Sequence, residues 1–419
     1  MHGLPESMQH HRVQAHPSAS VVRGTVRWSP GKSLWFTGMG LIAVVGGAAT
    51  FSWTAVAVFL IATGTVLLLG HSLGSHRKMI HDSFGCPRWL ERTLVWLGVQ
   101  VGLAGPIGLL RQHELRDFAQ RLPHCHPYLR HGSGFWTDAW WQLHCELELD
   151  APPDIAVEAR IADDPFYRWL ERTWRWQQLP LAVLLLAIGG WSFVVWGVCA
   201  RITAGVFGHW LIGYFAHNHG PMHHVVDGAA VQGHNIRWTS LLTMGESWHN
   251  NHHAFPGSAR LGIGPGEWDP GWWALVALQK CGLAWNLRTP DQLLPRVELR
   301  ALDAVGARTG DDQGAVPTWR ELWAWSDVRR VPEPLVLRGP SVTVPARAFA
   351  WLLGGGGNFT RDRAAQRLSG CLGGFRMSGL PALWLATARR SPLHRYAALA
   401  WLPAATGLES LRRFASVPR

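Results

Sequence analysis

Histidine is the residue type whose number and spacing indicate chemistry in this chain of 419 residues, which contains 22 of them. Seven lie in polar clusters beside apolar segments: His76, His81, His113, His217, His249, His252 and His253. The last three are spaced i, i+3 and i+4, which places them on one face of a helix. Neutral imidazoles bind transition metals, and one metal ion takes about four protein ligands. Seven imidazoles therefore predict two metal ions, and spacing alone leaves iron, zinc, copper and nickel open.

Two apolar regions are expected to hold these histidines in place. Residues 34–70 contain no charged side chain, and as a single helix they would extend ~55 Å, against a hydrocarbon core of ~30 Å. We therefore expect two spans that turn near residues 50–54. Residues 179–200 and 202–216 are also apolar, on either side of Arg201, and they predict a second hairpin.

An even number of spans places both termini on one side of the membrane. Arginines in segments 111–130 and 159–175 mark that side as the cytoplasm, because positively charged loops remain there. The expected fold is all-α and integral to the membrane, with four transmembrane helices as two hairpins and a cytosolic cap that carries the histidine clusters. Its expected parts are a cytoplasmic N-terminal segment (1–33), a membrane domain (34–290), a linker (291–345) and a C-terminal extension of unassigned role (346–419).

Composition supports a membrane protein and argues against several other classes. Charged residues make up 16%, below the ~25% of soluble proteins, and the 26 tryptophans suit the interfacial belts of a membrane protein. The net charge of +11 comes from arginines spread along the chain without a recognisable nucleic-acid motif, so we expect no nucleic-acid partner. The six cysteines include no CxxC pair and indicate neither a disulfide framework nor a zinc ribbon.

Three of the histidine segments match known motifs. His76 and His81 form an HxxxxH pair, the run 249–253 is His-Asn-Asn-His-His and is followed by Phe255-Pro256, and His217 lies in the segment 214–220. These segments resemble, in turn, the first histidine box, the third box (HNxHH-x-FP) and the NSxxHxxG segment of the membrane-bound fatty acyl desaturases, particularly the acyl-CoA Δ9 type. The resemblance covers residues 30–290.

The resemblance implies a four-span helical fold, a di-iron centre (two Fe) held by histidines and a kinked tunnel for the acyl chain. The reaction would be O2-dependent removal of two hydrogens from a CH2–CH2 unit of a fatty acyl chain carried by CoA or by a membrane lipid. The sequence has no nicotinamide, flavin or haem motif, so the electrons would come from an external donor such as ferredoxin or a cytochrome with its reductase. We expect a multi-pass protein of a bacterial inner membrane.

The second histidine box departs from the family pattern. The family has HRxHH, whereas residues 113–117 read His-Glu-Leu-Arg-Asp, so only the first histidine is kept. Asp117 stands in the place of the last histidine, and it is expected either to bind iron as a carboxylate or to pair with Arg116 or Arg121. Gly213 stands where the family has an asparagine. Additional metal ligands are sought among nearby histidines: His71, His124 and His126.

Two alternatives to a desaturase follow from the same residues. A lipid hydroxylase on the same scaffold would share the first hydrogen abstraction. A non-catalytic metal-binding membrane protein would account for the altered second box. Iron content together with an O2-dependent product distinguishes the enzymes from the metal-binding protein.

Overall fold

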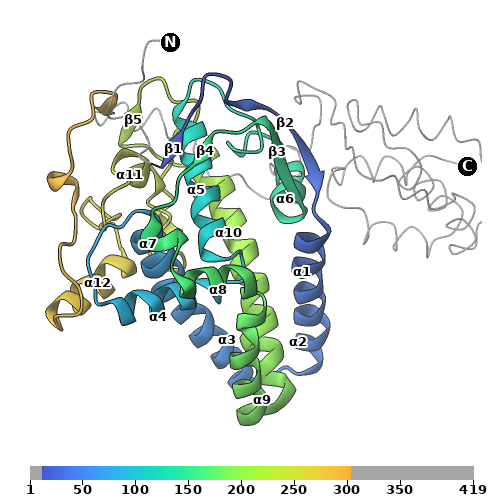
Figure 1. The fold of residues 1–419 in the computed structure, drawn as a ribbon. Helices are drawn as coiled ribbons and strands as arrows, with labels where there is room; N and C mark the ends of the chain where they lie inside the picture. Colours follow the sequence, from blue (N-terminus) through green and yellow to red (C-terminus); the bar gives the residue numbers. More distant parts are fainter. Residues whose placement is uncertain (1–11, 303–419) are drawn as a thin grey trace, which may run out of the picture. The chain divides into compact units, whose positions relative to one another are not determined.

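The computed structural model describes residues 12–302. The expected linker beyond residue 302 and the whole expected C-terminal extension lie outside these residues, as do residues 1–11. Figure 1 draws the described chain, which belongs to two compact units. The first holds Ser29–His131 with the described parts of Met1–Gly24 and Leu149–Val316, and the second holds Thr25–Trp28 and Gly132–Glu148. All of the predicted site residues belong to the first unit.

Within residues 12–302, three helical segments are long and apolar enough to cross a membrane. They are Pro30–Ala49, made of α1 (Pro30–Leu41), η2 (Ile42–Gly46) and α2 (Gly47–Ala49); Trp53–Ile80, made of α3 (Trp53–Thr65) and the π-helix η3 (Val66–Ile80); and Trp176–Asn218, made of η4 (Trp176–Gln178), α9 (Leu179–Val194), η5 (Val195–Ala200) and α10 (Arg201–Asn218). Such segments are typical of an integral membrane protein. The first break lies between Ala49 and Trp53, within the expected turn, and the Ser52 Oγ atom caps α3 by accepting from the Ala55 amide.

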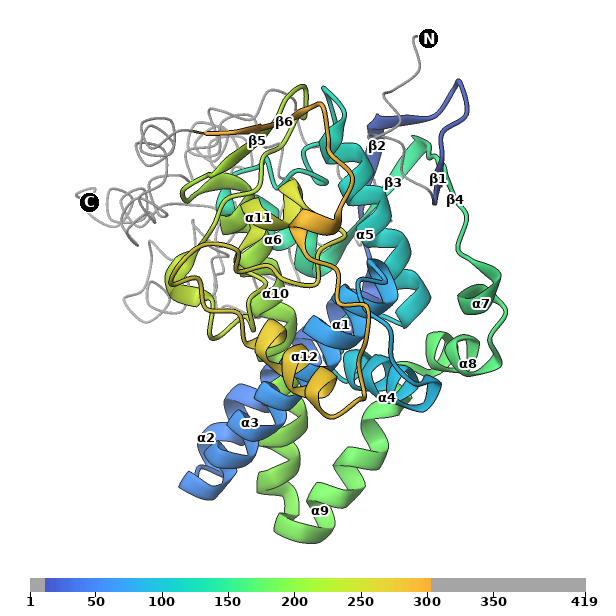
Figure 2. The same cartoon turned by 90° about the vertical axis from the view of Figure 1, so that its left-hand side faces the viewer.

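The third segment breaks at a different place from the one expected. The sequence suggested a turn at Arg201, but the backbone leaves the helical conformation at Gly189 and Gly190. Gly190 has φ +67°, a left-handed conformation that suits glycine because it lacks a Cβ atom. Figure 2 shows the chain reversing its direction within α9 before it continues through α10.

Arg201 is buried inside the helical run instead of marking its end. Its Nη2 atom donates to Gln178 Oε1 at 2.6 Å, its Nε donates to the Gly197 carbonyl at 2.8 Å, and its Nη1 donates to the Gln100 carbonyl. A guanidinium whose donors are satisfied in this way can stay within an apolar region. The sequence could not show these partners, because two of them lie 23 and 101 residues away.

The rest of the described chain consists of shorter helices, short strands and loops. The further helices are α4 (Arg88–Val99), α5 (Pro106–Arg121), α6 (Phe135–His144), α7 (Ala159–Ala162), α8 (Pro165–Thr173), η6 (Arg237–Thr239), α11 (His249–Ala254), α12 (Pro270–Lys280) and η7 (Pro290–Gln292). Short strands, which the all-α expectation did not include, pair two by two: β1 (Val13–Gln14) with β4 (Asp154–Ile155), β2 (Ser20–Trp28) with β3 (Cys145–Ala151), and β5 (His224–Val226) with β6 (Leu299–Ala301).

Two glycines let η3 pack closely against α4 just before the first histidine pair. A Cβ atom added to Gly70 would lie 2.4 Å from the Leu97 backbone, and one added to Gly74 would lie 2.1 Å from the Leu94 carbonyl oxygen. Backbone atoms cannot move aside as a flexible side chain can. The two helices therefore depend on small residues at these positions, and η3 ends against α4 with His76 in a defined place.

Replacing Gly74 with alanine is expected to destabilise the protein by about 1–3 kcal/mol, because the new methyl group forces η3 away from α4. The matched control is Gly64→Ala, in the same helical segment, where an added Cβ atom meets nothing within 4 Å. Thermal unfolding in detergent measures both. Equal midpoints for the two variants would contradict the tight packing of η3 on α4.

Candidate metal centre

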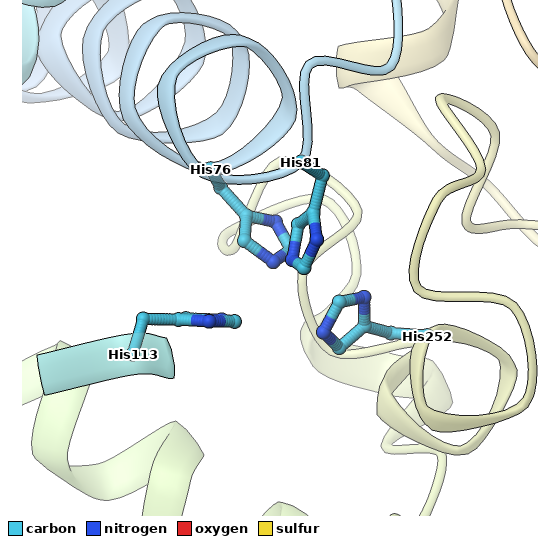
Figure 3. Close-up of side chains that lie close together, drawn as sticks. All are labelled: His76, His81, His113 and His252. Carbon is cyan, nitrogen blue, oxygen red and sulfur yellow. The ribbon is translucent and has the colours of Figure 1, made fainter. Parts of the chain in front are cut away.

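Four of the predicted histidines meet in a first histidine group. His76 comes from the end of η3, His81 directly follows that helix, His113 lies on α5 and His252 lies on α11. Each offers one ring nitrogen, and these four atoms lie within 4.8 Å of one another. Figure 3 shows the four rings pointing toward one another from separate elements. Two nitrogens that each lie ~2.1 Å from one metal are at most ~4.2 Å apart, so small movements of these rings would let the group hold one metal ion.

Three more predicted histidines meet in a second histidine group. His217 lies near the end of α10, and His249 and His253 lie one turn apart on α11. The His249 Nε2 atom is 3.0 Å from His217 Nε2 and 3.1 Å from His253 Nε2. Three imidazole nitrogens that converge in this way present lone pairs to a common point, which suits a bound cation.

The helix α11 thus supplies both groups, although it has only six residues. The i, i+3, i+4 spacing was expected to direct its three histidines to one face. In the structure His252 joins the first group, and His249 and His253 join the second. This division brings the two groups together along one helix, as a two-metal site requires.

The residues between the α11 histidines hold this short helix by side-chain hydrogen bonds. The Asn250 Oδ1 atom accepts from the amides of His223 and His224 at 2.7 and 2.9 Å. The Asn251 Nδ2 atom donates to Glu267 Oε2 at 2.8 Å, and the Asn235 side chain accepts from the Asn250 amide at 3.0 Å. All three asparagines are buried, so these contacts fix the helix and with it the direction of its histidines.

Glu246 is a residue of the site that sequence reasoning did not single out. Its Oε2 atom lies 2.5 Å from His76 Nδ1, and its Oε1 atom lies 2.7 Å from Arg77 Nη1 and 2.6 Å from Ser72 Oγ. A carboxylate on Nδ1 leaves Nε2 of His76 to face a metal, which is the usual support for a histidine ligand. Burial opposes the charge of Glu246, but His76 and Arg77 outweigh it and hold its pKa well below the usual range.

A second buried ion pair connects the chain segments that carry His81 and His113. The Arg12 Nη1 atom lies 2.6 Å from Glu114 Oε1, and it also donates to the Ile80 carbonyl. Glu114 follows His113 on α5, and Ile80 precedes His81. Both charged side chains are 1% exposed. Only the three-dimensional structure could reveal this pair, because its members are 102 residues apart.

Asp117 lies beside the first group on α5. Its Oδ2 atom is 3.7 Å from His113 Nδ1 and 4.0 Å from Arg121 Nη2, so the expected pairing with Arg121 is present as a loose contact. Burial opposes its charge, but His113 and Arg121 prevail and hold the pKa of Asp117 well below its usual range. Its charge also raises the pKa of His253, against the larger lowering by burial. Asp117 is therefore an ionised carboxylate whose charge acts on a member of each group.

The three additional histidines lie apart from both groups. The His71 ring packs on His209, with centroids 5.1 Å apart. His124 is exposed, and His126 Nδ1 accepts from the Tyr128 amide at 3.2 Å. The four-histidine and three-histidine sets found in the described residues contain none of the three.

The donor chemistry of both groups fits a transition metal. Imidazole nitrogens dominate, with the Asp117 carboxylate nearby, and both donor types suit iron. The Nδ1 atom of His252 is buried without a hydrogen-bond partner in the described part of the chain. A buried polar atom of this kind needs a partner, and a metal ion would provide one.

Comparison with known proteins places the chain in a family. The family model for fatty acid desaturase matches residues 51–261. Over 280 residues the chain is 36% identical to an sn-1 stearoyl-lipid 9-desaturase of Anabaena variabilis, covering 65% of this chain and 98% of the relative. It is 34% identical to an sn-2 palmitoyl-lipid 9-desaturase of Nostoc sp. (56% and 81% covered) and 30% identical to an acyl-CoA 5-desaturase of Anemone leveillei (59% and 76% covered).

Proposed function

Because the chain belongs to the fatty acid desaturase family and is an enzyme that desaturates fatty acids, we propose that it does so at a di-iron centre held by the two histidine groups. The observation that carries this proposal is the convergence of seven imidazoles into sets of four and three around α11. The first iron would be held by His76, His81, His113 and His252. The second would be held by His217, His249, His253 and the Asp117 carboxylate. When bound, the two irons supply the O2 activation needed to remove hydrogen from an unactivated CH2 group.

Asp117 is proposed as the fourth donor of the second iron because the second group holds one imidazole fewer than the first. The pKa of its carboxyl is already low, so no proton has to leave before it binds a metal. Asp117→Asn is expected to lower the affinity for the second iron and to leave the first in place. A chelator competition that finds both affinities unchanged would remove Asp117 from the ligand set.

The protein's own contribution is to orient the ligands and the acyl chain. Glu246 directs Nε2 of His76 toward the first iron, and the Gly213 carbonyl, 2.6 Å from His217 Nδ1, leaves Nε2 of His217 for the second. The tautomers of these two histidines are thereby set before a metal binds. The acyl chain would reach the irons from the membrane, between the helices that carry these ligands.

We propose four membrane crossings instead of three. The segment Trp176–Asn218 has 43 residues, ~65 Å if straight, and its reversal at Gly190 divides it into two arms that can each cross. The ligand-bearing ends of η3 and α10, at His76 and His217, then lie on one side. By the distribution of arginines this side is the cytoplasm of a bacterial cell, with both termini there. The functional domain is residues 34–290.

The proposed substrate is a fatty acyl chain attached to a membrane lipid, with a CoA thioester as the second candidate. Two relatives are named as acyl-lipid desaturases and one as an acyl-CoA desaturase. Two electrons per turnover would come from an external carrier, a ferredoxin or a cytochrome with its reductase.

Expression in a bacterial host of defined lipid composition tests the proposal. Mass spectrometry of the lipids should show acyl chains that have lost two hydrogens, only when O2 is present. Acyl chains that gain one oxygen atom would favour the hydroxylase. Purified protein without bound iron and cells without any new acyl product would favour the non-catalytic metal-binding protein.

A further inference from the structure

Two departures from the desaturase motifs lie against the same side chain. Arg116 replaces a box histidine and Gly213 replaces an asparagine, and the two are 97 positions apart in the chain. The Arg116 Nη1 atom is 2.5 Å from His131 Nε2. A Cβ atom on Gly213 would lie 3.1 Å from the same Nε2 atom, a distance that would force the ring to shift. The two changes are therefore compatible with one another through His131.

His131 is held firmly in this position. It is buried, with 4% exposure, and its φ of +52° is one that few residues other than glycine adopt. Its carbonyl oxygen accepts from Asn218 Nδ2 at 3.0 Å, and the Arg116 guanidinium also donates to the neighbouring Leu129 carbonyl at 3.3 Å. A strained backbone persists only where several contacts determine it, and these contacts do so.

The ring of His131 lies flat on a member of the second histidine group. Its centroid is 5.3 Å from that of His217, and the two planes differ by 13°. One edge of His217 is fixed by the Gly213 carbonyl at 2.6 Å from Nδ1, and its Nε2 atom points to His249 Nε2 at 3.0 Å. The stacked ring therefore limits rotation of the imidazole at the point where it would bind the second iron.

We propose that Arg116 and His131 are positioning residues of the second metal site: Arg116 fixes His131, and His131 holds His217 in its ligating orientation. Arg116 can only donate, so His131 Nε2 is the acceptor, and neither residue is a ligand. The positive charge of Arg116 and the negative charge of Asp117 sum to zero. This is the same formal charge that two neutral histidines would give at these positions. This inference rests on the proposed di-iron function.

The test uses the purified full-length chain, loaded with Fe(II) without oxygen and titrated against a competing chelator. Arg116→Met and His131→Ala are expected to lower the affinity for the second iron about 10–100-fold, the usual effect of removing a supporting contact, without changing the first. Arg116→Lys, which keeps a donor for His131, should restore part of the loss. His124→Ala, an exposed histidine of the same loop, should behave as wild type.

The outcomes separate this inference from the proposed function. If wild type binds two irons and both variants match it, the positioning role is wrong and the di-iron function stands. If the variants lose both irons together, the role is general folding and the inference is again wrong. If wild type itself binds fewer than two irons, the proposed function fails first. Gly213→Ala, which crowds His131 without removing it, should weaken the second site alone and thereby confirm the mechanism.

Discussion

Replacing His252 with alanine is expected to abolish desaturation, with a loss of more than about 100-fold, and to lower the iron content from two per chain to about one. Supporting contacts alone are worth 10–100-fold at metal sites, so the loss of a ligand should exceed that range. His252 belongs to the first group, with its ring centroid 4.6 Å from that of His76 and 4.9 Å from that of His81. Three remaining imidazoles would hold a metal poorly in a site built for four.

Acyl profiles and metal analysis of the same preparations measure this effect. His124→Ala is the matched control, because it removes an exposed imidazole that belongs to neither histidine group. It should retain the product and both irons. Full activity in His252→Ala, with the protein folded and inserted, would show that the first group is not the reacting metal site.

The second large effect is expected from Glu246→Gln. The glutamine keeps the shape but loses the charge that faces His76 Nδ1 at 2.5 Å and Arg77 Nη1 at 2.7 Å. Arg77 is 1% exposed and keeps only Asp269 at 2.8 Å as an ionised partner, so we expect a loss of stability of about 3 kcal/mol. The first iron should bind about 10–100-fold more weakly, because His76 loses its orienting carboxylate.

The dependence of protein stability on acid pH is a second test of the role of Glu246. Its folded pKa lies below the ordinary value of 4.5, so its ion pairs stabilise the protein fully above that pH and are lost as the pH falls toward the folded pKa. The Glu246→Gln variant should therefore be less stable than wild type at neutral pH. Its free energy of unfolding should also fall less as the pH is lowered. Glu148→Gln is the control, since its pair with Arg27 is exposed and worth little. A thermal midpoint and a chelator resistance equal to wild type would contradict the role of Glu246.

The histidines that the structure brings together can be recognised in the sequence because each histidine box is local in the chain. His249, His252 and His253 are recognisable from spacing alone, and the structure brings them together with four histidines from the other segments. Spacing alone does not show in which direction each histidine side chain points. The division of α11 between two groups depends on asparagine contacts to residues 223, 224 and 235, which tertiary folding alone provides.

The residues that support the histidine groups do not follow a local pattern in the sequence. Glu246 stands three positions before His249, a spacing that could have drawn attention to it, but nothing local shows that it reaches His76. A charge between two apolar runs predicts the end of a span at Arg201, because charges usually lie outside the membrane. In the structure Gln178 and two carbonyls satisfy its donors, so Arg201 lies within the helical run, and the chain turns earlier, at Gly189 and Gly190. Each difference arises from a long-range hydrogen bond.

The central claim is most directly tested by measuring iron and product on the same purified, lipid-embedded protein. Wild type should contain two irons per chain and, when given O2, a reducing system and a fatty acyl substrate, should form an acyl product lighter by two hydrogens. His252→Ala in the same lipid should contain about one iron and form none. Product formed by protein with no iron, or an iron-loaded wild type that leaves every acyl substrate unchanged, would contradict a di-iron desaturase built on the two histidine groups.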